Sequence, residues 1–212
     1  MTEISLTLMR HGRSRADDEQ VHEGRYDSLL TEVGRAQAQA RASQWQAEGA
    51  SFDCVIASTL QRAHETAKIV AQALNAPLET DSDRMEIDNG PLAGVPFDAV
   101  EVRFPKHPYE PFMGTGESDW EIHCRAVKAV QKIVRRGAGQ YLVVAHGGIL
   151  NAALRGIVGA QPNVDGRGIW FALGDTGYAR AAYIPPTPPT STSPSSPSPP
   201  PPSPNLPECT RP

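Results

Sequence analysis

The sequence of 212 residues has few cysteines and no long apolar run. Its three cysteines, Cys54, Cys124 and Cys209, are an odd number at wide spacing, which indicates neither a disulfide framework nor a metal knuckle. No apolar run approaches the length needed to span a bilayer. The first residues include the acidic Glu3 and lack the charged-then-apolar layout of a signal peptide. We therefore expect a soluble protein of a reducing compartment, cytoplasmic and without a membrane partner.

An excess of positive charge is also absent. The formal net charge is −4 and the pI is about 5.9, although arginine (16) far outnumbers lysine (4). Because the chain has no global basic field, we expect no nucleic-acid partner. Arginine is so frequent that no single arginine indicates a site by itself.

Proline is distributed unevenly. Thirteen of the 20 prolines lie in residues 185–212, among serine and threonine and with almost no large apolar residue. Such a segment cannot bury enough surface to offset the entropy of ordering it. The composition predicts a folded domain over residues 1–184 and a disordered, partly polyproline-II tail over 185–212. Its Pro-x-x-Pro spacing suits a polyproline-binding partner, and an extension without a partner is the alternative that we favour.

Within the domain, strand-like and helical runs alternate. The pattern predicts helices over 31–48, 60–75, 118–136 and 148–158, a short helix near 98–103, and strands over 4–9, 54–57, 141–145, 169–173 and 178–184. Thr31 is a predicted helix cap, Gly49 a predicted helix stop, and Ser58 with Gln61 and Ser118 with Glu121 have capping-box spacing. Strands separated by helices predict an α/β fold: a three-layer α/β/α sandwich with a mostly parallel central sheet.

Polar residues follow three of these strands. Arg10-His11-Gly12 follows the first, Ser58 and then Arg62 follow the second, and His146-Gly147-Gly148 follows the third. In a parallel sheet the functional crevice lies beyond the carboxyl ends of the strands, and helix N-termini there suit a phosphate. A His-Gly pair after a strand is more often a simple turn, and Arg62 alone would be a solvated helix residue. Together they favour an anion pocket with a nucleophilic imidazole, whereas a zinc site would need carboxylate or cysteine ligands nearby.

Five segments, in order, resemble the motifs of the histidine phosphatase superfamily, the phosphoglycerate mutase-like family. They span Met9 to Gly159, nearly all of the predicted domain, and read "LMRHGRSRADDEQVHEGRYDSLLTEVGRAQA", "VIASTLQRAHETA", "MEIDNGPLAG", "GTGESDWEIHCRAV" and "YLVVAHGGILNAALRGIVG".

The resemblance implies a phosphoglycerate mutase-like fold and a role for each matching residue. His11 would attack phosphorus and form a phosphohistidine, and Arg10, Arg62 and His146 would hold the phosphoryl oxygens. Glu86 would be the general acid and then the base. No metal or other cofactor is implied. The substrate-binding positions that it implies are Ser14, Asp17, Gly24, Arg25 and Gly147.

Two positions of the first motif depart from the family pattern, as does Leu92-Ala93, which stands where the Glu86 motif often has Trp-Glu. Arg13 stands where the family often has glutamate, and Asp17 stands where it often has a phosphate-binding asparagine. A carboxylate about 5 Å from the phosphoryl group, at an effective dielectric of about 20, would repel it by roughly 3 kcal/mol. Pairing of Asp17 with Arg13 or Arg15, or a turn of Asp17 away from the site, would weaken that repulsion.

The resemblance leaves the reaction open between a phosphatase and a mutase. A mutase of this family needs a lid after the Glu86 motif, but only 21 residues, 95–115, separate Gly94 from Gly116. We therefore expect a phosphatase acting on a small phosphorylated substrate or a phosphoprotein, with Arg103, Lys106 and His107 as candidate contacts to the rest of the substrate. The alternatives are a phosphoglycerate mutase and a weakly active phospho-ligand-binding protein with an interaction tail. The sequence predicts neither the substrate nor the oligomeric state.

Overall fold

A computed structural model describes residues 3–185 of the chain. The predicted tail therefore lies outside the described residues, apart from Pro185, as does Cys209. None of the helices within residues 3–185 is both long and apolar enough to cross a membrane.

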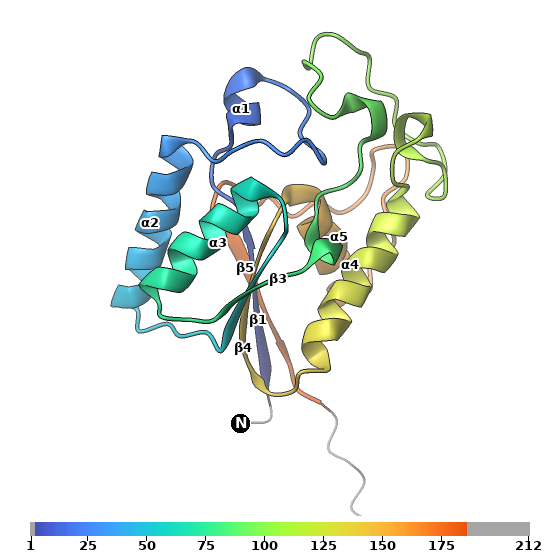
Figure 1. Ribbon diagram of the computed structural model, residues 1–212. Helices are drawn as coiled ribbons and strands as arrows, with labels where there is room; N and C mark the ends of the chain where they lie inside the picture. Colours follow the sequence, from blue (N-terminus) through green and yellow to red (C-terminus); the bar gives the residue numbers. More distant parts are fainter. Residues whose placement is uncertain (1–2, 186–212) are drawn as a thin grey trace, which may run out of the picture.

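A five-stranded sheet with the order β3-β2-β4-β1-β5 forms the centre of the molecule (Figure 1). Four of its strands run parallel, and the edge strand β5 runs antiparallel to β1. The strands are β1 (Ile4–Arg10), β2 (Cys54–Ala57), β3 (Leu78–Thr80), β4 (Gly139–Ala145) and β5 (Tyr178–Tyr183). In the register of β1 and β4, Arg10 pairs with Ala145, so the residues that follow both strands start at the same level.

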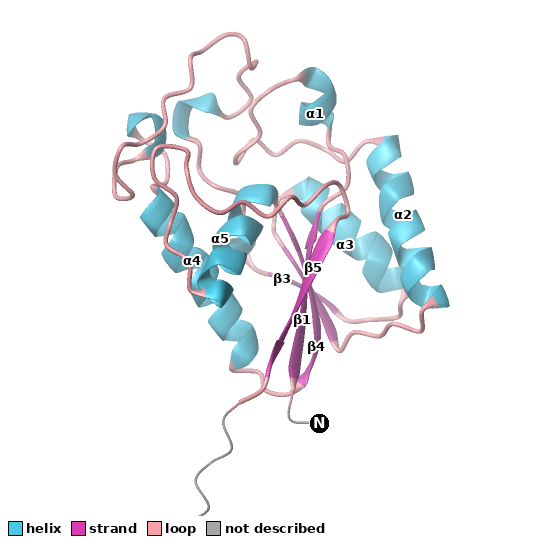
Figure 2. Ribbon diagram, turned by 180° about the vertical axis from the view of Figure 1, so that it is seen from behind, coloured by secondary structure: helices cyan, strands magenta, loops and turns pink. Residues whose placement is uncertain are grey.

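Two pairs of helices cover the two faces of the sheet. Figure 2 shows α2 (Glu32–Ala47) and α3 (Gln61–Ala73) on one face, and α4 (Asp119–Val134) and α5 (Gly147–Val158) on the other. Alternate strand residues point to opposite layers: Val143 packs among side chains of α4 and α5, whereas Leu142 packs in the cluster that holds Trp45 of α2. The predicted three-layer α/β/α sandwich is confirmed.

Three of the predicted helix boundaries occur as expected. The Thr31 hydroxyl accepts a hydrogen bond from the Gly34 amide at 3.0 Å, and Gly49, just past α2, has a left-handed φ of 67°. Ser118 and Glu121 form a reciprocal capping box at the start of α4. The capping box expected at Ser58 is wrong, because α3 starts after Leu60 and Asp27 of the preceding loop accepts from the Gln61 amide at 2.7 Å instead.

The predicted strand over 169–173 is also wrong. Phe171 meets no neighbouring strand: its amide donates to the Asn151 side chain at 2.7 Å, and its carbonyl accepts from the same side chain at 3.1 Å. These two bonds satisfy the backbone that a sheet partner would otherwise satisfy.

Several short elements differ from the prediction. Residues 98–103 form no helix: all of them except Val102 are exposed, and so short a helix is not stable in water without a buried face. The short strand β3 and the helix α1 (Arg15–Glu19) were not predicted. Three 3₁₀ turns complete the described chain: η1 (Ser82–Arg84), η2 (Gly90–Leu92) and η3 (Phe112–Gly114).

Candidate active site

The carboxyl ends of β1, β2 and β4 bring His11, Arg62 and His146 together. These ends lie at the loop-covered end of the sheet, opposite the N-terminus (Figure 1). The His11 amide donates to the Ala145 carbonyl at 3.0 Å, which ties the loop after β1 to the end of β4. The two imidazole ring centroids are 5.1 Å apart, and Arg62 Nε lies 3.2 Å from His11 Nε2. Both histidines are almost fully buried, so the surrounding protein controls their charge.

The surroundings of His11 fix both its tautomer and its charge. Its Nδ1 lies 2.7 Å from the Gly12 carbonyl oxygen. A carbonyl can only accept, so Nδ1 carries the proton and Nε2 presents a lone pair toward Arg62. Burial, the Arg62 guanidinium and Arg10 all lower the pKa of His11 well below its ordinary value, against an opposing effect of the Gly12 carbonyl. His11 is therefore a neutral imidazole with a nucleophilic Nε2.

Arg62 is held by the loop that follows α1. Its Nη1 donates to the Tyr26 carbonyl at 2.9 Å and its Nη2 to the Gly24 carbonyl at 3.0 Å. The Thr66 hydroxyl links the two parts of the site, because it donates to the Arg62 carbonyl and accepts from the Gly12 amide. The guanidinium is thus fixed before any ligand arrives, with Nε directed at His11.

His146 lies beside Ser58, at the end of the neighbouring strand. Its Nε2 is 2.8 Å from the Ser58 hydroxyl, while its buried Nδ1 has no hydrogen-bond partner among residues 3–185. Burial lowers the pKa of His146 well below its ordinary value, and the charges of the Arg62 and Arg10 guanidinium groups lower it further. His146 is neutral in the unliganded site, and an anion placed between the two histidines would favour its protonation.

Arg10 is flanked by two carboxylates. Its guanidinium nitrogens lie 3.9 Å from Asp17 and 3.7 Å from Asp175. Asp175 belongs to the loop before β5, and the sequence analysis did not identify it. It is separated from Arg10 by 165 residues, so no local signal points to this contact.

Asp17 remains at the site, and neither arginine that was expected to neutralise it does so. Arg13 pairs with Asp18 at 2.6 Å, and Arg15 pairs with Glu19 at 2.8 Å. The Asp17 carboxylate accepts from the amide and the hydroxyl of Ser14 at 2.8 and 3.0 Å. This bonding anchors Asp17 next to Arg10 and leaves its charge within the pocket.

Glu23 is a second carboxylate that the sequence analysis missed. Its Oε1 lies 3.2 Å from Arg62 Nε, and its Oε2 lies 3.7 Å from His11 Nε2. The Ser28 hydroxyl donates to it, and it shares the single proton of the Ser14 hydroxyl with Asp17. Burial raises the pKa of Glu23, against the opposing charge of Arg62. The Glu23 carboxylate is thus bound by the groups that an incoming oxyanion would contact. In the sequence, only its position beside Gly24 in the first motif could have indicated that Glu23 lies at the site.

Glu86 is positioned at the start of α5. Its carboxylate accepts from the amides of Gly148 at 2.9 Å and Ile149 at 3.0 Å, and also from its own neighbour Ile87 at 2.8 Å. A Cβ at residue 148 would lie 2.5 Å from Glu86 Oε1, so only glycine permits this approach. The helix dipole of α5 also favours a negative group there.

The remaining predicted binding residues have mixed positions. Gly24 contributes its carbonyl to Arg62, and Ser14 contacts Asp17 and Glu23. Arg25 pairs instead with Asp88 at 3.3 Å and with Glu117 at 3.7 Å, and does not line the active-site cavity. Gly147 is the first residue of α5, and its neighbour Gly148 lines the cavity in its place.

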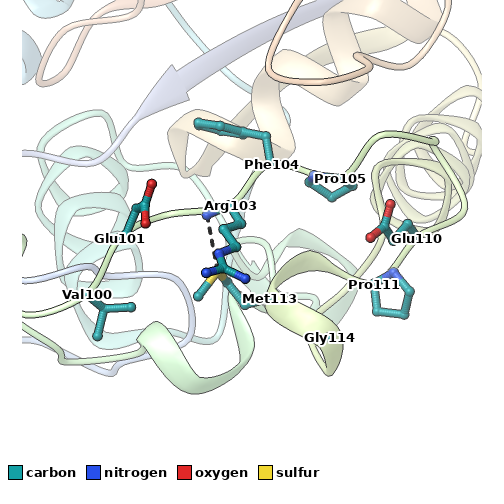
Figure 3. A pocket seen from close by; sticks show the side chains of 9 residues that line it. All are labelled: Val100, Glu101, Arg103, Phe104, Pro105, Glu110, Pro111, Met113 and Gly114. Carbon is teal, nitrogen blue, oxygen red and sulfur yellow. Dashed lines mark hydrogen bonds between the residues drawn. The ribbon is translucent and has the colours of Figure 1, made fainter.

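A cavity of about 340 Å³ adjoins this group of residues. Glu23, Glu86 and Gly148 are among the residues that line it. Arg103, expected as a substrate contact, lines a separate surface pocket together with Met113, and Figure 3 shows its side chain pointing away from that of Phe104. Lys106 and His107 do not line the cavity either.

Comparisons with known proteins agree with this geometry. The model of the histidine phosphatase superfamily (branch 1) matches residues 6–170. "Uncharacterized phosphatase PhoE" of Bacillus subtilis (strain 168) is 30% identical over 161 residues, which cover 76% of this chain and 80% of that protein. "Probable phosphoglycerate mutase GpmB" of Yersinia enterocolitica is 29% identical over 172 residues, which cover 77% of this chain and 79% of that protein.

Among solved structures, Bacillus stearothermophilus YhfR is 27% identical and superposes with a TM-score of 0.71, covering 84% of this chain and 90% of that one. The matched residues include every strand end that carries His11, Arg62 or His146. The chain therefore belongs to branch 1 of the histidine phosphatase superfamily, and is an enzyme of the phosphatase or mutase type.

Proposed function

We propose that this protein is a phosphatase that hydrolyses a phosphomonoester through a phosphohistidine on His11, without a metal ion. The observation that carries the proposal is the state of His11. Its proton is held on Nδ1 by the Gly12 carbonyl, and its Nε2 lone pair faces the fixed Arg62 guanidinium. A neutral imidazole directed at an arginine is the arrangement needed to attack a phosphorus atom whose oxygens bind that arginine.

The reaction has two steps. His11 Nε2 forms a bond to phosphorus while the bond from phosphorus to the leaving-group oxygen breaks, and Glu86 supplies the proton to that oxygen. Glu86 then takes a proton from water, which attacks phosphorus, and the bond to His11 breaks to release phosphate. Arg10, Arg62 and a protonated His146 stabilise the charge that spreads over the phosphoryl oxygens. Because these cations surround the site, no metal is assigned.

The charges that line the cavity favour a phosphatase over a mutase. A mutase must keep a bisphosphate intermediate bound while that intermediate reorients in the site. Asp17, Glu23, Glu86 and Asp119 line the cavity against one lining arginine, Arg155, so the summed charge of the lining would repel a second phosphate placed there. The short 95–115 segment, whose one helical element is η3, also supports hydrolysis.

Turnover of an aryl phosphate with and without EDTA tests the proposal. We expect hydrolysis of 4-nitrophenyl phosphate at an unchanged rate after chelation and dialysis, because the arginines supply the positive charge. Loss of activity with EDTA and its recovery with a divalent cation would contradict the metal-independent mechanism. Interconversion of 2- and 3-phosphoglycerate faster than release of phosphate would identify a mutase. Binding of phosphate esters without turnover would identify the phospho-ligand-binding alternative.

Replacement of Glu23 by glutamine is expected to lower KM for a phosphomonoester by about tenfold at pH 7.5, since it removes a negative charge from the oxyanion site. The variant keeps a group of similar size that can still accept from Ser14 and Ser28. Burial raises the pKa of Glu23, so the parent carboxyl gains a proton as the pH falls and its repulsion disappears. The ratio of kcat/KM between variant and parent should therefore fall toward one as the pH is lowered from 7.5 to 5.

Glu19→Gln is the matched control, because Glu19 is an exposed carboxylate of α1 that pairs with Arg15. It should leave KM unchanged at every pH. A Glu23→Gln enzyme with a higher KM than the parent would contradict this account and would mean that Glu23 helps to bind the substrate.

A further inference from the structure

Resting on the proposed function, we propose that the substrate is a phosphomonoester of an aromatic alcohol, and that its ring occupies the cavity beyond Glu23 and Glu86. The site described above accounts for the phosphoryl group alone. The rest of the substrate must occupy the cavity of about 340 Å³ that opens from Glu23 and Glu86. Cavities that bind small ligands start at roughly 300 Å³, so this one suits a compact group.

Apolar side chains form a large part of the cavity wall. The apolar members are Val21, Ile87, Leu92, Phe97, Phe104, Pro105, Phe112, Ile122 and Trp170. Phe97, Phe104 and Phe112 come from the 95–115 segment and Trp170 from the loop before β5, and the ring centroids of Phe104 and Phe112 are 6.1 Å apart. Phe104 lines both this cavity and the surface pocket of Arg103, and Figure 3 shows the side chains of Phe104 and Arg103 pointing in different directions.

Three of the aromatic side chains are exposed although they are large and apolar. Phe97 is 54%, Phe104 55% and Trp170 61% exposed. Apolar side chains that gather at the rim of a cavity, and not singly on the surface, mark a surface that a ligand covers. A ring bound among them would bury apolar area on both sides and could stack on their faces.

The cavity lining carries unpaired polar atoms. Arg155 is only 3% exposed, its Nε has no hydrogen-bond partner among residues 3–185, and its guanidinium lies 5.8 Å from the Trp170 ring centroid. Asn163 also lines this cavity, and its buried Oδ1 likewise has no partner in the described chain. Buried polar atoms without partners are rare in folded proteins, and two further lining residues, His22 and Asn89, carry one each. These atoms support a ligand site that extends beyond the phosphoryl pocket and that bonds a polar group of the substrate beside its ring.

Two substrates with leaving groups of similar basicity test the proposal: 2-phenylethyl phosphate and ethyl phosphate. Both release a primary alcohol, so a difference between them reports contacts with the ring and not the quality of the leaving group. We expect kcat/KM to be about 100-fold higher for 2-phenylethyl phosphate, as is typical for an apolar group that fills a matching pocket. Phe104→Ala and Trp170→Ala should each reduce that ratio by about five- to tenfold. Both side chains are over half exposed, so the variants should fold.

Tyr109→Ala is the matched control. Tyr109 is 67% exposed, belongs to the same insert as Phe104 and packs on Trp120, outside the cavity lining. The substrate ratio should not change in this variant. Equal kcat/KM for the two esters, with hydrolysis that depends on His11, would overturn the aromatic substrate and leave the proposed function intact.

Calorimetric titration with 3-phenylpropylphosphonate and with propylphosphonate separates the two proposals when no ester is hydrolysed. Tighter binding of the aromatic phosphonate, lost in Trp170→Ala, would support the aromatic site and contradict the phosphatase proposal. Equal affinity for the two phosphonates, or no binding of either, would overturn the aromatic site.

Discussion

Replacement of His11 by alanine is expected to lower kcat for phosphomonoester hydrolysis by at least about 10⁴-fold, because it removes the only atom that bonds to phosphorus in the first step. The remaining cations would still bind the substrate, so KM should change far less than kcat. Steady-state assays with enzyme that is free of parent contamination, together with a thermal unfolding curve, measure both effects. The unfolding curve matters because His11 is buried against His146 and Arg62.

The control for this prediction is His64→Ala, which removes a partly exposed imidazole from α3. It should retain the activity of the parent. His146→Ala provides the sharper comparison, since the two buried imidazoles are neighbours. If His11→Ala kept more than a tenth of the activity while His146→Ala lost it all, His146 would be the nucleophile and the assignment here would be wrong.

Replacement of Arg62 by lysine is expected to lower kcat by about 10²–10³-fold, although the positive charge is kept. The ammonium of lysine cannot reproduce the planar fork that donates to Gly24 and Tyr26 while Nε faces His11. One donor to the phosphoryl oxygens and the alignment of His11 are lost together. Single-turnover assays at saturating substrate would show the loss in the chemical step.

Arg35→Lys is the matched control for this charge-conserving change. Arg35 pairs with Glu32 and Glu65 between α2 and α3 and does not contact the site. Its variant should retain activity within about twofold, the effect expected of a surface ion pair on function. An Arg62→Lys enzyme with the kcat of the parent would contradict this prediction. It would show that a single positive charge is enough for catalysis and that the fork geometry of the guanidinium is not needed.

The central part of the site could be predicted because it follows from the order of the strands. His11, Arg62 and His146 each come directly after, or one turn beyond, a buried strand, and parallel neighbours deliver such residues to one edge. The caps at Thr31 and Ser118 could also be predicted, since a cap depends on residues only three positions apart.

The features that the sequence did not predict depend on loops. Glu23 reaches His11 because of the way the segment after α1 folds over Arg62, and Asp175 reaches Arg10 from the opposite end of the chain. The run at 169–173 is apolar although it is not a strand. Phe171 and Leu173 pack on the core, whereas Trp170 lines the cavity, and a sequence pattern alone does not distinguish these roles from those of strand residues. Its backbone is satisfied by Asn151, a side chain that no strand signal identifies.

The most direct test of the account is to trap the phosphorylated enzyme. Rapid quenching of the parent under alkaline conditions, during turnover of an aryl phosphate, should give a peptide that contains His11 and one phosphoryl group. Phosphorus NMR of the denatured protein should identify the isomer phosphorylated at Nε2, since the Gly12 carbonyl holds the proton on Nδ1. A phosphoryl group found at Nδ1 or on another residue, or full turnover with no phosphoenzyme at any quench time, would contradict the account.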